Sequence, residues 1–142
     1  MNSIKGKFAL VTGGTQGLGA AIAKNFAENG AEGIITIGRK EEKGKEVAKK
    51  IQEETGCKVI FVKTDLPNVQ ECRNAVTVAK KNFGKLDVLV NAAGITDRGN
   101  IVNTSEELFD KMIGTNVKGP FFLIQETVKI MIDQGIQGSI IN

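Results

Sequence analysis

The sequence predicts an α/β domain with an open, doubly wound parallel sheet of about five strands. Short apolar runs alternate with segments of helical periodicity along the whole chain, which is the pattern of right-handed βαβ crossovers. The runs show little polar alternation, as expected of strands that are covered on both faces. The 142 residues contain no linker, repeat or low-complexity segment, so the length fits one domain.

The first half of the chain is expected to alternate between three strands and two helices. The predicted strands span residues 8–11, 33–37 and 58–62, and the predicted helices span residues 18–29 and about 41–54. Gly30 and Gly56 are placed to end the two helices, because glycine adopts the left-handed conformation common just after a helix. On the first helix, the face expected to pack on the sheet consists of Leu18, Ile22, Ala23 and Phe26.

The second half continues the alternation. Pro67 follows the turn Thr64-Asp65-Leu66 and suits the first position of the next helix. Apolar residues at spacings of three and four predict that helix over residues 69–83, and Gly84 would end it. Thr104 or Ser105 can cap a further helix. The other predicted elements are a strand at 86–90, a long helix at about 117–133 and a fifth strand beginning at 139–141.

Missing residue types exclude several kinds of chemistry. The chain has no histidine, tryptophan or tyrosine, so a Ser-His-Asp triad and imidazole metal ligands are excluded. Cys57 and Cys72 are too few for a four-thiolate zinc site and do not form a CxxC motif. We interpret them as a strand-edge and a core-face residue without chemistry, and we expect no metal site.

The charge pattern does not indicate a nucleic-acid or membrane partner. The net charge is +3, from 19 basic and 16 acidic residues that are mixed along the chain. The densest stretch carries Glu41–Lys45 and Glu46–Lys50, which are spaced as i,i+4 pairs on a solvated helix face. No apolar run approaches the roughly 20 residues of a membrane span, and no signal-peptide pattern is visible. Few cysteines fit a reducing compartment, so the predicted location is the cytoplasm.

A glycine-rich loop joins the first strand to the first helix, with the sequence Thr12-Gly13-Gly14-Thr15-Gln16-Gly17-Leu18-Gly19. Free N–H groups and the helix dipole favour a ligand phosphate over that helix N-terminus. Gly13 would permit a tight turn, Gly17 would let the backbone approach a ligand, and Gly19 would let helix and sheet pack closely. The spacing is neither GxGxxG nor a Walker A motif, and a purely structural turn is the alternative.

Further motifs follow the glycine loop in order. They are Asp65-Leu66 after the third strand, Asn91-Ala92-Ala93-Gly94 after the fourth, Asn116 before Val117-Lys118-Gly119, and residues 138–142. With these motifs in register, the sequence from residue 7 to residue 142 resembles the short-chain dehydrogenases/reductases in their TGxxxGxG form. The resemblance implies a Rossmann-type sheet, one dinucleotide-binding domain over residues 1–142, and an oxidoreductase.

The resemblance also assigns candidate site residues. Those that would bind the cofactor are Gly13, Thr15, Gln16, Gly17, Leu18, Gly19, Arg39, Asp65, Leu66, Asn91, Ala92 and Gly94. Asp65 would contact the adenine ring, and its alternative is a turn aspartate bonded to its own backbone. Ala92 stands where the commoner family form has a second asparagine. Asn116 matches an asparagine of the family's catalytic tetrad, and its alternative is a residue of a helix junction.

Arg39 predicts which nicotinamide cofactor is preferred. An NAD-selective site places an acid about 20 residues beyond the glycine loop, on the ribose 2′-hydroxyl. Here Gly38 and Arg39 occupy that region, and a guanidinium pairs a phosphate in bidentate geometry. We therefore expect NADP, with NAD as the less favoured cofactor. Glu41 and Glu42 oppose this argument, and the alternative is that Arg39 only begins a solvated helix.

The chain departs from the family after the fifth strand. Family members transfer hydride between a nicotinamide and an alcohol or carbonyl with a serine, a tyrosine and a lysine that follow that strand, and no position here matches them. We expect a C-terminally incomplete domain that lacks the last strands and helices and is inactive alone, with a small alcohol or carbonyl as the substrate of the parent enzyme. The apolar helix at 117–133 implies a homo-oligomer, and its alternative is a core within one chain.

Two other functions compete with the oxidoreductase. One is a non-catalytic dinucleotide-binding module or pseudoenzyme, which a reading frame that stops naturally at Asn142 would favour. The other is a receiver-like signalling domain, which gives no reason for the glycine loop or for Asn91 to Gly94. The substrate itself cannot be predicted from these residues.

Overall fold

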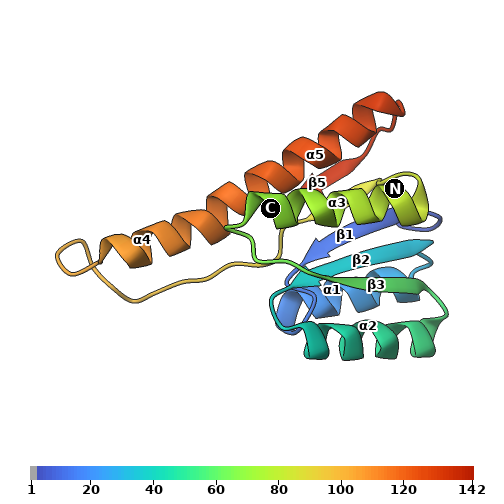
Figure 1. Cartoon of the computed structure of the whole chain (residues 1–142). Coiled ribbons are helices and arrows are strands. Elements are labelled where there is room, and N and C mark those ends of the chain that lie inside the picture. The colour runs from blue at the N-terminus through green and yellow to red at the C-terminus, as the bar shows by residue number, and fades with distance from the viewer. Residues whose placement is uncertain (1–2) are drawn as a thin grey trace.

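The computed structural model describes residues 3–142 and confirms the doubly wound α/β class. Five parallel strands form one sheet in the order β3-β2-β1-β4-β5 (Figure 1). Their bounds are Phe8–Thr12 for β1, Gly33–Gly38 for β2, Lys58–Lys63 for β3, Val88–Val90 for β4 and Ser139–Ile141 for β5.

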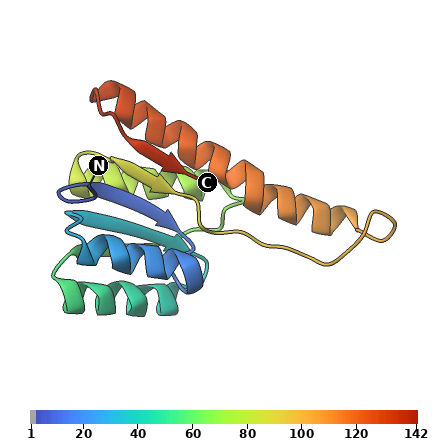
Figure 2. The ribbon, with the colours of Figure 1, turned by 180° about the vertical axis from the view of Figure 1, so that it is seen from behind.

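Helices cover both faces of the sheet. Helices α1 (Gly17–Glu28) and α2 (Glu41–Thr55) lie on one face, whereas α3 (Val69–Phe83) and α5 (Gly119–Asp133) lie on the other (Figures 1 and 2). Alternate residues of β1 serve the two layers, since Leu10 joins the core under α3 and α5 and Val11 joins the core under α1 and α2. The strands are therefore apolar on both sides, as their sequence indicated.

The strand order changes direction between β1 and β4. Leu10 pairs with Ile35 of β2 on one side and with Leu89 of β4 on the other. The chain thus winds outward from β1 to β3, crosses back to β4, and winds outward again to β5. In open α/β sheets, ligands bind outside the carboxyl ends of the strands at such a switch point.

The region from residue 104 to residue 133 differs from the prediction of two separate helices. Helix α4 (Glu106–Ile113) runs through a π-helical segment, η1 (Gly114–Lys118), directly into α5, and the α4 end extends beyond the sheet (Figure 1). Ser105 is the capping residue, because its Oγ accepts a hydrogen bond from the Leu108 N–H at 3.2 Å. The Thr104 hydroxyl instead donates to the carbonyl oxygen of Asn100 at 2.8 Å.

Pro67 is not the first helical residue that the sequence predicted. Helix α3 begins at Val69, and Asn68 caps it by accepting hydrogen bonds from the N–H groups of Gln70 and Glu71. Pro67 therefore belongs to the turn before the cap. The cap has a physical reason, since an asparagine oxygen satisfies two N–H groups that the helix itself leaves without partners.

Several predicted side-chain environments were wrong or only partly right. Leu18 is 68% exposed and does not share the core face of α1. Lys45 pairs with Glu41, as expected, but Lys50 lies 3.9 Å from Glu54 and forms no pair with Glu46 in the described part of the chain. Cys57 and Cys72 are buried and unpaired, as their interpretation required.

Helix α5 buries only one side. Leu123, Thr127 and Ile130 are buried, whereas Phe121 is 58% exposed and Ile132 is 73% exposed. Helix α5 is thus not enclosed on all sides by residues 3–142. Within those residues, none of the helices combines the length and apolar character required to cross a membrane.

Candidate functional site

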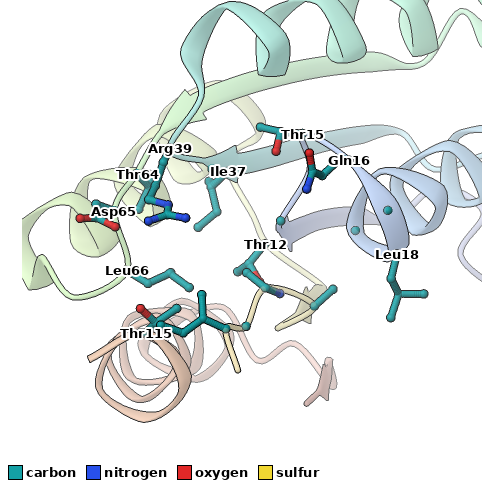
Figure 3. Close-up of a pocket in the computed structure, with 18 residues that line it drawn as sticks. Thr12, Thr15, Gln16, Leu18, Ile37, Arg39, Thr64, Asp65, Leu66 and Thr115 are labelled. Carbon is teal, nitrogen blue, oxygen red and sulfur yellow. The ribbon is translucent and has the colours of Figure 1, made fainter. Parts of the chain in front are cut away.

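A cleft lies at the carboxyl edge of the sheet, beside the point where the strand order changes. The loops after β1, β2, β3 and β4 all contribute to it, and η1 closes one side (Figure 3). Its volume of about 270 Å³ falls near the lower end of small-molecule pockets. Its lining includes most of the predicted cofactor-binding residues: Gly13, Thr15, Gln16, Gly17, Leu18, Gly19, Arg39, Asp65, Leu66, Ala92 and Gly94.

Two glycines give the glycine loop its shape. Gly13 has a φ of +74°, and a Cβ built there would lie 3.3 Å from the Cα of Ala93. A Cβ at Gly19 would lie 2.5 Å from the carbonyl oxygens of both Thr12 and Gly13. Since these neighbours are backbone atoms, no side-chain rotation would relieve the overlap. Gly19 therefore allows α1 to start directly against the end of β1.

Gly17 leaves space in the cleft. Its φ is +58°, and nothing lies within 4 Å of the position that a Cβ would occupy. Gln16, the N-cap of α1, makes no side-chain capping hydrogen bond. The N–H groups of the first turn of α1 therefore have no side-chain cap, and the positive end of a twelve-residue helix faces this space. This arrangement suits an anion, with glycine keeping the approach open.

Thr12 begins the predicted glycine-rich loop but was not among the predicted cofactor-binding residues, and its role in the site is structural. Its Oγ1 accepts a hydrogen bond from the Ala93 N–H at 2.8 Å, across 81 residues of sequence. This bond fixes the segment after β4 against the end of β1. A polar residue ending a buried apolar strand was the available signal. Other lining residues that were not predicted are Ile37, Gly38, Thr64, Ala93, Ile95 and Thr115.

Arg39 and Asp65 lie at the rim of the cleft and are exposed. Arg39, Thr15 and Gln16 lie along one rim, with Leu66 and Thr115 on the opposite one (Figure 3). The backbone N–H of Asp65 donates to Glu71 at 2.7 Å, and its carbonyl oxygen accepts from the Asn68 N–H at 2.9 Å. The Asp65 carboxylate itself makes no hydrogen bond or ion pair in residues 3–142. The alternative of a side chain bonded to its own backbone is therefore not seen.

Asn91 and Asn116 do not line this cleft but an adjoining hollow of about 460 Å³, which shares Ala93, Gly94 and Ile95 with it. The Asn116 Oδ1 accepts from the Ile95 N–H at 2.9 Å, and its Nδ2 donates to the Ile95 carbonyl oxygen at 2.8 Å. The Asn91 Nδ2 donates to the Asn142 Oδ1 at 2.7 Å. The predicted residues thus form two neighbouring groups joined by one loop.

The π-helical segment explains how Asn116 reaches Ile95. Segment η1 is centred on Asn116, and such single π turns occur frequently at functional sites. The extra residue per turn changes the direction in which the following side chains point. Asn116 thus lies at a helix junction, as the alternative interpretation proposed. Its amide also makes two hydrogen bonds to the Ile95 backbone.

The two cysteines lie outside both hollows. Burial raises the pKa of the Cys72 thiol to about 11 and also raises the pKa of Cys57. The Cys72 Sγ is 3.4 Å from the Leu66 carbonyl oxygen, to which it donates. A buried neutral thiol is a poor nucleophile, so neither cysteine offers chemistry to the site.

Comparison with known proteins finds one family that matches nearly the whole chain. The family model described as short chain dehydrogenase matches residues 7–142. An uncharacterized oxidoreductase of Thermotoga maritima is 42% identical over 140 residues, which cover 99% of this chain and 54% of the relative. The chain spans about half the length of the first curated relatives that it matches.

Two solved structures match the fold closely. L-Sorbose reductase from Gluconobacter frateurii, complexed with NADPH and L-sorbose, has a TM-score of 0.91 and 30% identity, covering 97% of this chain and 52% of that one. A metagenomic short-chain oxidoreductase in complex with NADP has a TM-score of 0.88 and 30% identity, covering 98% of this chain and 62% of that one.

Proposed function

The chain belongs to the short-chain dehydrogenase family, and from that premise we propose that it supplies the NADP-binding part of an oxidoreductase. The activity would be hydride transfer between the nicotinamide ring and the carbon of a small alcohol or carbonyl compound. When bound, the cofactor supplies the hydride chemistry, while the protein supplies position and electrostatics. The cleft and the adjoining hollow would hold the two reactants.

The observation that carries this proposal is the open N-terminus of α1 in a cleft whose rim also holds Arg39 and Asp65. Gly19 brings the start of α1 against β1, and Gly17 leaves the helix N-terminus open to a phosphate. The exposed Asp65 carboxylate lies at the rim near Arg39, where it can accept a hydrogen bond from an adenine amino group. Because the cleft measures about 270 Å³, the rest of a dinucleotide would extend toward the hollow that holds Asn116.

The preference for NADP over NAD rests on Arg39. The turn after β2 brings this guanidinium to the rim of the cleft. No acidic residue stands at the end of β2 or at the start of the turn, where the chain has Gly38 and Arg39. A guanidinium can hold a 2′-phosphate in bidentate geometry. The matched structures with NADPH and NADP support the same choice.

The catalytic step needs groups that these residues do not contain. The chain has no tyrosine to act as acid or base, and loss of a general acid or base typically costs about 10²–10⁴-fold in rate. We therefore expect the 142 residues to bind NADP without reducing carbonyl compounds. Asn116 would act as a positioning residue, because its amide fixes the Ile95 backbone between the two hollows.

Location and assembly form part of the same proposal. Two buried, unpaired cysteines suit a reducing compartment, so we place the protein in the cytoplasm. The exposed Phe121 and Ile132 side chains of α5 are suited to a contact between copies, so we propose a homo-oligomer.

Calorimetric titration of the chain with NADP⁺ and NAD⁺ tests the proposal. We expect tighter binding of NADP⁺, and Arg39→Gln should weaken NADP⁺ by about 10–100-fold, the usual range for a hydrogen bond to a charged group. NAD⁺ binding should change little in that variant. Lys49→Gln, on the exposed side of α2, is the matched control. Tighter binding of NAD⁺ than of NADP⁺ would refute the cofactor preference, and no binding of either would refute the proposed function.

A further inference from the structure

We propose that Lys43 is a second cation of the 2′-phosphate subsite, positioned by Gln16 of the glycine loop. The inference rests on the proposed NADP function. It adds a residue of α2 that belongs neither to the glycine loop nor to the Gly38-Arg39 turn. Its basis is a contact between α2 and the cleft. The Lys43 Nζ donates a hydrogen bond to the Gln16 Oε1 at 3.0 Å, across 27 residues of sequence.

This contact brings a positive charge to the rim of the cleft. Gln16 lines the cleft directly, and Arg39 lines it from the turn before α2. Lys43 lies in the first turn of α2, which begins two residues after Arg39. Arg39 and Gln16 lie along the same rim in Figure 3. A phosphate at this rim would therefore lie between the guanidinium and the ammonium.

Lys43 differs from the other lysines of α2 because it has no carboxylate partner in the described part of the chain. Lys45 lies 2.6 Å from Glu41, while Lys49 and Lys50 lie 3.7 and 3.9 Å from Glu53 and Glu54. Within residues 3–142, Lys43 has no carboxylate oxygen within 4.0 Å, and neither has Arg39. Both cations at the rim are therefore free to pair with an anionic ligand.

The nearby acid residue Glu41 does not compete for this role. Its carboxylate is held by Lys45, whose hydrogen bond and charge lower the pKa of Glu41, with a further contribution from Lys63. Glu41 is therefore directed along α2 and is already neutralised. The objection that Glu41 would repel a 2′-phosphate is thereby weakened.

Gln16 suits a positioning role because it is uncharged. An ammonium group can only donate, so the amide oxygen of Gln16 faces Lys43 and its NH₂ group faces away. A phosphate carrying nearly two negative charges would attract Lys43 more strongly than a neutral amide oxygen does. Gln16 thus holds the ammonium near the subsite without neutralising it.

Binding of 2′,5′-ADP and 5′-AMP to the full chain isolates the 2′-phosphate and tests the inference. Lys43→Gln should weaken 2′,5′-ADP by about fivefold, the scale of an exposed charge pair, and leave 5′-AMP within about twofold. Lys43→Arg should keep most of the affinity, since it preserves the charge. Lys49→Gln removes a charge from the same helix and should change neither ligand. The loss in Lys43→Gln should shrink in 1 M salt, where the screening length is about 3 Å.

The outcomes separate this inference from the proposed function. If Lys43→Gln weakens both ligands equally, Lys43 only braces the glycine loop and the inference is wrong. If it weakens neither, the inference is also wrong, while NADP binding by the wild-type chain still supports the proposed function. If the wild-type chain prefers 5′-AMP, the NADP proposal fails before any variant is measured. A melting temperature for each variant close to that of the wild type shows that folding is not the cause.

Discussion

Alanine in place of Gly17 separates the ligand-binding role of this glycine from its conformational role. Gly17 and Gly56 both have left-handed backbones, with φ values of +58° and +75°. Neither has an atom within 4 Å of the position that a Cβ would occupy. Gly17 lines the cleft, whereas Gly56 follows α2 outside it. The two substitutions are therefore matched in strain and differ in whether they face the cleft.

The expected magnitudes follow from this geometry. A non-glycine residue in the left-handed region costs about 1–2 kcal/mol, and no overlap adds to that cost at either position. For a domain of this size, about 1 kcal/mol lowers the melting temperature by roughly 4 °C. Both variants should therefore melt about 4–8 °C below the wild-type chain. Only Gly17→Ala places a methyl group where a phosphate would approach the helix N-terminus, which should weaken NADP binding by at least about tenfold.

The assay combines a thermal melt with calorimetric titration by NADP⁺ for the wild-type chain and both variants. At 100 times its Kd, NADP⁺ should stabilise the wild-type chain by about 2.7 kcal/mol. Gly56→Ala should keep this stabilisation, whereas a tenfold weaker Kd would leave Gly17→Ala only about 1.4 kcal/mol of it at the same NADP⁺ concentration. Equal affinity for NADP⁺ in the two variants would refute the reasoning, because the open space at Gly17 would then have no role in binding. Unequal melting temperatures without ligand would refute the claim of matched strain.

Three further predictions concern stability. Asn116→Ala removes both hydrogen bonds to Ile95, and because the site is exposed it should cost about 1 kcal/mol in chemical denaturation; an unchanged midpoint would contradict this. Burial raises the pKa of Cys72 from 9.0 to about 11. The stability that the neutral thiol contributes is therefore fully present below pH 9 and is lost as the pH rises toward 11. The melting temperature of Cys72→Ala should fall less over that interval than the melting temperature of the wild-type chain. The hydrogen bond from Lys24 lowers the pKa of Glu54 from 4.5. The stability that this pair contributes is therefore present above pH 4.5 and is lost as the pH falls below it. Glu54→Gln should show a shallower loss of stability in acid than the wild-type chain.

Local sequence patterns were sufficient for the sheet and for the position of the cleft. Apolar strand runs such as 33–37 and helix-ending glycines such as Gly56 can be recognised from a few consecutive residues. The candidate residues of the glycine loop and of the strand ends then came together because parallel strands end at one edge. Sequence order alone therefore placed Gly13 and Arg39 beside the same space.

Two kinds of feature could not be predicted from local patterns. They are the contacts between residues far apart in sequence and the joining of two predicted helices into one. The bond between Thr12 and Ala93 spans 81 residues, and the bond between Lys43 and Gln16 spans 27 residues, so no local pattern indicates which residue is the partner in either bond. Leu18 matched a core-facing periodicity, but its position over the cleft exposes it. The π-helical segment at Gly114–Lys118 contains an extra residue per turn, which breaks the spacing on which helix prediction depends.

The segment from Asn91 to Ile95 connects the two halves of the site. Thr12 fixes it from β1 through Ala93, and Asn116 fixes it from η1 through Ile95. The cleft and the adjoining hollow both use Ala93, Gly94 and Ile95 as a wall. A ligand in the cleft and a group in the hollow would therefore both contact one hydrogen-bonded strip of backbone. Under the proposed function, the small residues at 92–94 would keep the space beside this strip open, since a larger side chain there would project into the room that the two ligands need.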